Sequence, residues 1–194
     1  MADMSTADQD EWHTAIIRAV WQVIAERGMA GVSMRTVAAA AGVSVGRIQY
    51  RFHTKEELLR ASLEAMLTGA TDRYAAAVAG ADDAESLWQL IAHPLPRTRA
   101  ARTGVALFHQ YVAGGVTHPA LADLLAEAKD GAEREAARLI TRIAPQVRAP
   151  RTVARSLIAT ADGLGMRVLT GGLSARAAER TLRATVDQAL RRTT

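Results

Sequence analysis

Residues 33–52 read SMRTVAAAAGVSVGRIQYRF and carry the strongest structural signal in the chain. Ser33 is a suitable N-cap for a short helix over about residues 34–41, where a run of alanines favours helix. Gly42 then interrupts the helix, and a second short helix is expected over about residues 44–50. Two short helices joined by a tight turn that contains glycine are typical of a helix-turn-helix. The stretch therefore predicts this motif.

The side chains of this stretch divide into an inward and an outward set. Val37, Ala38 and Ala41 give the first helix a small apolar face, and Ile48 and Phe52 can point from the second helix into the core. The other positions of the second helix share its outward faces: Val45, Gly46, Arg47, Gln49, Tyr50 and Arg51. Arginine and glutamine can hydrogen-bond guanine and adenine edges in the major groove. The outward set predicts a DNA-reading surface.

Basic residues concentrate in the same region. From position 27 to position 55 the chain has five basic residues and no acidic one: Arg27, Arg35, Arg47, Arg51 and Lys55. Such a patch is the electrostatic footprint of a nucleic-acid reader, although a solvated charged face gives the same pattern. Arg35 and Lys55 are better suited to phosphates than to bases.

The rest of the chain has helical periodicity and no convincing strand. Helices are expected over about residues 8–27, 55–79, 84–92, 151–170 and 174–191, with one that ends at residues 114–115 and one that begins near residue 119. Thr54, followed three residues later by Glu57, is a capping-box pattern for the long helix. The sequence predicts an all-α protein of about nine helices.

Composition excludes several classes of site. The chain has no cysteine, so disulfides, thiolate catalysis and Cys-based zinc sites are excluded. Its five histidines contain no pair spaced four residues apart, and no metal or other cofactor is expected. No stretch approaches the roughly 18 apolar residues of a membrane span, and the acidic N-terminus is unlike a secretory signal. We expect a cytoplasmic protein without membrane contact.

Residues 42–46, GVSVG, match the nucleophile elbow G-x-S-x-G of serine hydrolases. That motif requires a strand before the serine and a helix after it. Here the preceding residues are expected to be helical, so we interpret the match as accidental and expect no enzyme activity.

The stretch Ile16–Leu58 resembles the TetR-type transcriptional regulators. The residues that carry the resemblance are Gly28, Thr36, Val37, the Ala-Gly-Val-Ser turn at 41–44, Gly46, Phe52 and the Lys-Glu pair at 55–56. The family pattern most often has tyrosine where this chain has Gln49 and an aromatic residue where it has Arg51, so Tyr50 is expected to take the aromatic contact to phosphate. Residues 161–182 are similar to the choline/betaine repressor subgroup.

The resemblance implies a DNA-binding helix-turn-helix domain at 1–54 and a helical-bundle domain at 55–194 that binds a ligand and dimerises. It implies a homodimeric repressor that a small-molecule effector releases from double-stranded operator DNA. The expected DNA-binding residues are Arg35, Thr36, Ser44, Val45, Gly46, Arg47, Gln49, Tyr50, Arg51, His53 and Lys55. The expected ligand-binding residues are Trp88, His93, Phe108, Tyr111 and Met166, each of which also fits an ordinary core position. The expected dimer contacts are Leu157, Ala161, Leu164, Val168, Leu182 and Val186.

Three points remain open at this level. The penultimate helix is apolar over an arc wider than one core-facing stripe, which fits either burial against a partner subunit or a central place within one chain. Asp162 in that helix can pair, line a pocket or face solvent. A helical scaffold or adaptor explains the C-terminal region but not the basic, glycine-turned N-terminal one, and alanine substitution of Arg47 and Gln49 separates the two readings.

Overall fold

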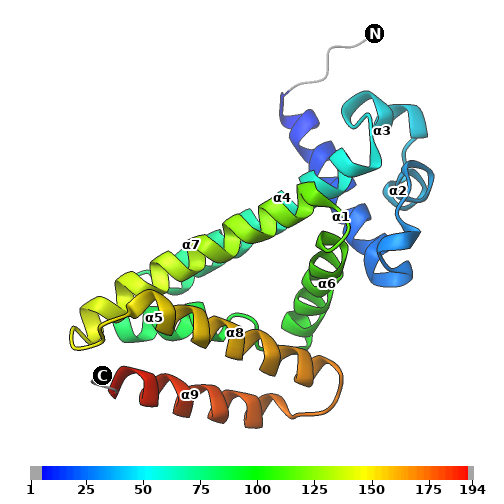
Figure 1. The fold of residues 1–194 in the computed structure, drawn as a ribbon. Coiled ribbons are helices and arrows are strands. Elements are labelled where there is room, and N and C mark those ends of the chain that lie inside the picture. The colour runs from blue at the N-terminus through cyan, green and yellow to red at the C-terminus, as the bar shows by residue number, and fades with distance from the viewer. Residues whose placement is uncertain (1–5, 192–194) are drawn as a thin grey trace. The chain divides into compact units, whose positions relative to one another are not determined.

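The chain is described here by a computed structural model that covers residues 6–191, with side chains from Glu11 onward (Figure 1). These residues form nine α-helices and one short 3-10 turn, with no strand. The elements are α1 (Thr6–Arg27), η1 (Met29–Gly31), α2 (Met34–Ala41), α3 (Val45–Arg51), α4 (Lys55–Ala77), α5 (Asp83–Ala92), α6 (Arg99–Gly115), α7 (Pro119–Ile143), α8 (Pro150–Leu169) and α9 (Ala175–Arg191). The predicted all-α fold of about nine helices is confirmed.

Packing divides the described chain into two compact units. The first, called the head unit, comprises the residues up to Thr68 together with Leu107–Leu125; the second, called the body unit, comprises Gly69–Ala106 and the residues from Ala126 onward. The head unit thus includes residues from α4, α6 and α7 besides the first three helices. These packing units do not test the predicted boundary between a DNA-binding domain and a ligand-binding domain at residues 54 and 55, which stays a prediction.

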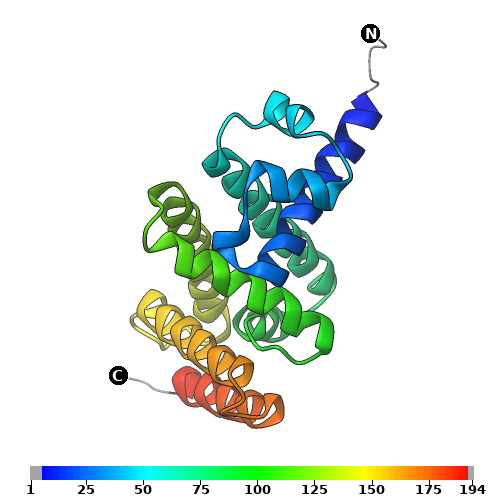
Figure 2. The ribbon, with the colours of Figure 1, turned by 90° about the vertical axis from the view of Figure 1, so that its right-hand side faces the viewer.

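The head unit has its own apolar core. The predicted stripe of α1 is buried at Ile16, Val20, Val23 and Ile24, and it packs with residues of α2, α3, α4 and α6. α2 lies against α1, and α3 follows α2 after a tight turn (Figures 1 and 2). A continuous core beneath α2 and α3 gives these short helices the support that they cannot provide alone.

A buried hydrogen-bond network crosses the head unit. The Tyr111 hydroxyl lies 2.6 Å from Ser62 Oγ, which donates to the Leu59 carbonyl oxygen at 2.7 Å. Because the single hydroxyl proton of Ser62 is used there, the Tyr111 hydroxyl acts as the donor to Ser62. Trp21 Nε1 donates to the Ser62 carbonyl oxygen at 3.1 Å. The network joins α1, α4 and α6 through polar groups that are all paired.

In the body unit, α8 lies against both α5 and α9. All six residues predicted to form dimer contacts are buried in this core: Leu157, Ala161, Leu164, Val168, Leu182 and Val186. Two neighbouring helices of the same chain therefore account for the wide apolar arc of α8, and the arc by itself requires no second subunit. The dimer contacts stay a prediction.

Gly165 allows a close approach within the body unit. A Cβ built at this position would lie 2.5 Å from the Pro94 carbonyl oxygen, which is closer than atoms can pack. Gly163, on the same helix, has nothing within 4 Å of a built Cβ. The segment after α5 therefore packs directly on the backbone of α8 at Gly165.

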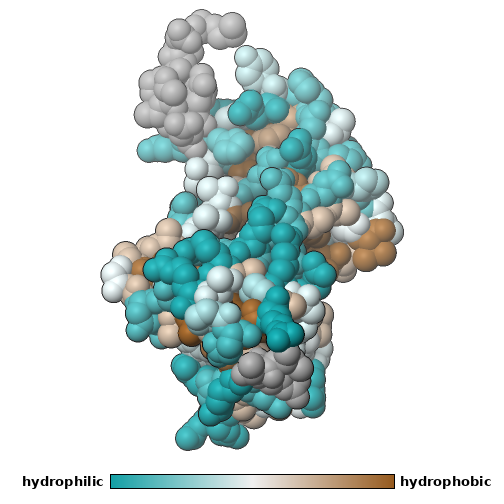
Figure 3. Space-filling model, turned by 60° about the vertical axis from the view of Figure 1, so that its left-hand side comes forward, coloured by the Kyte–Doolittle hydropathy of each residue, from teal (hydrophilic) through white to brown (hydrophobic). Residues whose placement is uncertain are grey.

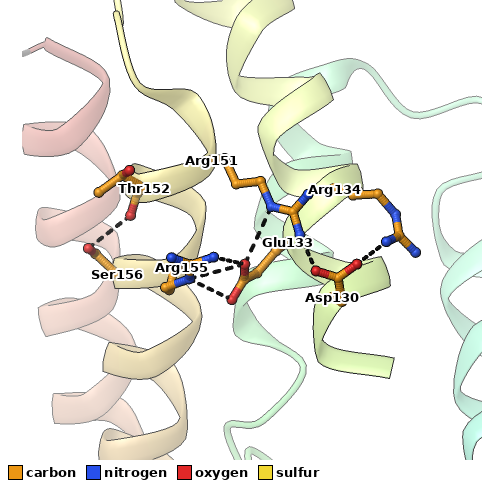
Figure 4. Close-up of polar contacts among 7 residues, drawn as sticks. All are labelled: Asp130, Glu133, Arg134, Arg151, Thr152, Arg155 and Ser156. Carbon is orange, nitrogen blue, oxygen red and sulfur yellow. Dashed lines mark hydrogen bonds and ion pairs between the residues drawn. The ribbon is translucent and has the colours of Figure 1, made fainter. Parts of the chain in front are cut away.

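Ion pairs connect α7 and α8 on the body surface (Figure 4). Arg155 of α8 holds Glu133 of α7 at 2.9 Å, and Asp130 receives both Arg134 and Arg151. Hydrogen bonding to Arg155 is the main reason why the pKa of Glu133 lies below its ordinary value. Exposed pairs of this kind each stabilise little, but a network orients neighbouring helices.

The face in Figure 3 is mainly hydrophilic, and its apolar patches are small and separated. Among the described residues, no helix is long and apolar enough to cross a membrane.

Candidate nucleic-acid interface

The N-terminus of α2 is held by a capping box. The Ser33 hydroxyl accepts from the Thr36 backbone N–H at 3.1 Å, and Thr36 Oγ1 accepts from the Ser33 N–H at 2.9 Å. Thr36 Oγ1 also donates to the Gly31 carbonyl oxygen at 2.8 Å. Ser33 is the predicted N-cap, and α2 occupies the predicted residues. The Thr36 hydroxyl is therefore engaged in positioning α2, while its predicted phosphate contact remains a prediction.

The turn between α2 and α3 depends on Gly42. This residue has φ = 67° and ψ = 30°, in the left-handed region, and its N–H caps the end of α2. A side chain at this position would be strained, which explains the glycine. Ser44 is the N-cap of α3, and its hydroxyl accepts from the Arg47 N–H at 3.2 Å. Because a helix, α2, precedes Ser44, the residues 42–46 do not form a nucleophile elbow.

α3 separates an inward from an outward face as predicted, except that Val45, predicted outward, is partly buried. Ile48 and Phe52 are buried in the head core, and Val45 packs partly against it. On the opposite side Tyr50 is 85% exposed. Gln49 and Arg51 are exposed as well. The outward face of α3 thus presents an aromatic, an amide and a guanidinium group to an external partner.

Gly46 lies at the start of this outward face. Nothing in the described chain lies within 4 Å of a Cβ built there, and its φ is not in the left-handed region. The fold itself therefore does not require glycine at this position. Its absence of a side chain leaves room for the close approach of another molecule to the α3 backbone.

Arg47 is exposed but contacts α1. Its guanidinium carbon lies 5.2 Å from the centre of the Trp12 ring, within the range of a cation–π contact. The sequence predicted the outward position of Arg47 but not Trp12, because nothing in the local pattern shows that α1 passes beside α3.

Three further cations, in α3 and at the starts of α2 and α4, have no intramolecular carboxylate partner. Within the described residues, Arg35, Arg51 and Lys55 form no ion pair. The chain immediately after α3 is held differently: Thr54 Oγ1 caps α4 by accepting from the Glu57 N–H at 3.1 Å, and Glu57 accepts from the His53 N–H at 2.7 Å. Glu57 is the predicted residue of the capping box, but its carboxylate accepts from the N–H of His53, one residue before the N-cap Thr54. The cations remain available to an anionic partner.

A recess of about 330 Å³ lies within the head unit, and sequence reasoning did not find it. Its lining combines the first residue of α4 with residues of η1, of the end of α6 and of the turn after α6: Met29, Ala30, Lys55, Gln110, Ala113, Gly114, Thr117 and His118. These residues are far apart in the sequence and share no motif, so only the fold brings them together.

The five predicted ligand-binding residues are distributed over both units. Trp88, His93 and Met166 belong to the body unit, where Trp88 is buried and Met166 is 43% exposed. Phe108 and Tyr111 belong to the head unit. Burial raises the pKa of Tyr111 to about 12, and its hydroxyl is engaged by Ser62. Their role as ligand contacts stays a prediction.

Two family descriptions match this chain. The family of bacterial regulatory proteins of the tetR type matches residues 16–62, and the C-terminal domain of BetI-type transcriptional repressors matches residues 83–191. Together they cover the helix-turn-helix and most of the remaining helices.

Individual relatives agree with this assignment. The HTH-type transcriptional regulator BetI of Stenotrophomonas maltophilia is 31% identical over 161 residues, which cover 81% of each chain. The HTH-type transcriptional regulator PksA of Bacillus subtilis is 39% identical over 66 residues, 34% of this chain and 32% of that protein, so this chain matches only a third of PksA. A transcriptional regulator of Saccharomonospora viridis, solved in complex with choline, has 28% identity and a TM-score of 0.83, covering 92% of this chain and 97% of the other.

The motif, its cationic exposed face and these matches lead to one assignment. The chain belongs to the TetR family of DNA-binding transcriptional regulators, with a C-terminal region of the BetI repressor type.

Proposed function

We propose that this protein acts in the cytoplasm as a homodimeric repressor that leaves its operator when a small molecule binds the body unit. The observation that carries the proposal is the outward face of α3. Gly46, Gln49, Tyr50 and Arg51 are exposed there, and the side chains of the last three form no hydrogen bond or ion pair within the described chain.

In this proposal two copies place α3 in successive major grooves of the operator. The half-sites are related by a two-fold axis and lie about one helical turn or a multiple of it apart. Arg47, Gln49 and Tyr50 read bases, while Arg35 and Lys55 neutralise phosphates. The caps at Ser33 and Ser44 hold α2 and α3 in the orientation that this contact requires.

The proposal assigns control to a ligand because of the relatives. BetI-type repressors match the C-terminal region, and a structural neighbour was solved with choline. A ligand shifts the protein away from DNA only by its differential affinity for the two states, typically about 1–3 kcal/mol. A dimer whose two α3 helices are wrongly spaced for the operator is the state that the ligand favours.

The test is binding of the purified full-length protein to DNA from upstream of its own gene and to a scrambled duplex, across a salt series. We expect a preference of about a thousandfold or more for the native fragment, with a steep salt dependence. Equal affinity for both duplexes would remove the specific operator from the proposal. An absence of binding at low salt would overturn the DNA-reading role of α3.

A further inference from the structure

The recess of the head unit is lined by η1, the start of α4, the end of α6 and the turn after α6. Its volume of about 330 Å³ lies at the lower end of the range for small-molecule sites, about 300–1,000 Å³. Part of the lining is apolar: Met29 packs on Gly114, where a built Cβ would lie 3.3 Å from Met29 Cε, and Ala113 precedes Gly114 in the lining. Methionine is flexible and polarisable, so this wall can adapt to the apolar part of a ligand.

Two polar side chains of the lining, Lys55 and Gln110, have no partner among the described residues. The Lys55 ammonium group forms no ion pair or hydrogen bond there, although the residue is partly buried, and the Gln110 amide forms no hydrogen bond there either. Thr117 Oγ1 and His118 Nδ1 are engaged, because both donate to the Gly114 carbonyl oxygen, at 3.3 and 2.9 Å. Lys55 and Gln110 are therefore the polar groups of the lining that are free to bind a ligand.

The charge of the recess selects the class of ligand. None of the described residues that line it is acidic, and Lys55 supplies a positive charge. An ammonium group beside apolar walls attracts anions, and the attraction strengthens where the ligand displaces water. A carboxylate carries one negative charge, which Lys55 balances, and its second oxygen can accept from the Gln110 amide. A phosphate dianion would bring more negative charge than this one ammonium group balances.

We propose that the recess binds a small organic carboxylate, whose charged group contacts Lys55 and Gln110 and whose apolar part packs on Met29 and Ala113. The site consists of head-unit residues, unlike the effector site proposed for the body unit. Lys55 is also expected to neutralise an operator phosphate, so a bound carboxylate competes with DNA for the same ammonium group. This competition rests on the proposed function, whereas the binding of the carboxylate does not.

Three probes test the class of ligand: benzoate, benzamide and inorganic phosphate. Benzoate and benzamide have nearly the same size and shape and differ in charge. Calorimetric titration of the full chain without DNA measures each affinity. We expect benzoate to bind about tenfold or more tightly than either other probe, because it alone combines one negative charge with an apolar body. Equal affinity for benzoate and benzamide, tighter binding of phosphate, or no binding of benzoate would overturn the proposal.

Removal of the cation tests the assigned contact. Lys55→Gln should weaken benzoate binding about tenfold, since the charge-assisted contact is lost. Arg51→Gln is the matched control, because Arg51 is also a cation of the head unit without an ion pair among the described residues but does not line the recess. Equal benzoate affinities of the two variants would overturn the assigned contact.

Filling the recess tests its role independently of charge. Ala113→Leu adds a side chain to the lining and leaves Lys55 and Gln110 in place, so benzoate binding should fall about tenfold or more. Ala120→Leu is the matched control, because Ala120 is also an exposed helical alanine of the head unit but lies outside the lining. Thermal unfolding verifies that both variants are folded. Unchanged benzoate affinity of folded Ala113→Leu would overturn the assigned recess.

Operator binding is measured separately, so the two proposals can fail independently. Saturating benzoate should weaken operator binding of the wild type at least about fivefold and have no such effect on Lys55→Gln. If the protein binds benzoate but not the operator, the repressor proposal fails and the carboxylate site stands. If it binds the operator but not benzoate, the repressor proposal stands and the carboxylate site fails. Binding of both without mutual weakening would overturn the competition.

Discussion

The head and body units use their charged residues in different ways. Around α3 of the head unit, Arg35, Arg51 and Lys55 have no carboxylate partner within the described residues. On the body unit, most arginines of α7 and α8 are paired with acids of the same unit, as Arg155 with Glu133 and Arg142 with Asp83.

The two units thus contain two kinds of charged residue: those paired within the chain and those without an intramolecular partner. An intramolecular pair joins two helices and satisfies both groups, and its net contribution at the surface is small. Unpaired cations that lie close together repel one another and attract anions from outside the chain. In this protein such cations lie on and beside α3 of the head unit, where we propose that DNA binds.

The largest expected effect is a loss of stability in the body unit, with no change at the α3 surface of the head unit. Gly165→Ala should lower the free energy of unfolding by about 2–3 kcal/mol, because the new methyl group overlaps the Pro94 carbonyl oxygen. Gly163→Ala on the same helix should raise it by about 0.5–1 kcal/mol, since alanine favours helix and the space is open. Urea denaturation of both variants measures the difference, and equal effects would contradict the close approach.

A second expected effect concerns the head surface. Arg47→Ala should weaken operator binding by about 1–3 kcal/mol and relax base preference, because a base contact is lost. Lys55→Ala should weaken binding to all sequences alike and reduce the salt slope by about one. Affinities of both variants for the operator and for mutated operators, measured by titration, distinguish the two effects. Unchanged specificity in Arg47→Ala, together with lower thermal stability, would assign Arg47 to its Trp12 contact instead.

A third expected effect concerns the interior of the head unit. Tyr111→Phe should destabilise the protein by about 1 kcal/mol, since it removes the hydroxyl that donates to Ser62. Tyr50→Phe should leave stability unchanged, because Tyr50 is exposed and its hydroxyl has no partner within the described residues.

The same residue gives a test by pH. The folded pKa of Tyr111 is raised from 10.0 to about 12, so the unfolded chain loses this proton first. The contribution of Tyr111 is therefore complete below pH 10 and declines as the pH rises toward about 12. Stability of the wild type should fall more steeply in that range than stability of Tyr111→Phe. Parallel curves would contradict the buried environment of Tyr111.

The smallest expected effect concerns the paired body surface. The folded pKa of Glu133 is lowered, chiefly by its hydrogen bond with Arg155. Its contribution is present above the ordinary value near 4.5 and is lost as the pH falls through the lower folded pKa. Glu133→Gln should therefore lose less stability than the wild type on acidification, as acid unfolding curves would show. Glu127→Gln, at an exposed and unpaired position of α7, should behave like the wild type.

Local sequence determined much of the head unit. The N-cap at Ser33, the left-handed turn at Gly42 and the inward positions of Ile48 and Phe52 depend on residues within one or two turns of each other, so periodicity and turn chemistry predict them. The wide apolar arc of α8 was a harder case. Its side chains showed that the helix is buried on more than one side but not what covers it, and α5 and α9 cover it within the chain.

By itself, the sequence determined the all-helical fold, the helix-turn-helix and the cationic outward face of α3, because short-range physical chemistry controls each of them. Only the tertiary structure decided that Trp12 lies beneath Arg47, that Tyr111 joins Ser62, and that Lys129 holds Asp162. These contacts join residues up to several helices apart. They arise from the way that whole helices pack, which no local pattern of residues encodes.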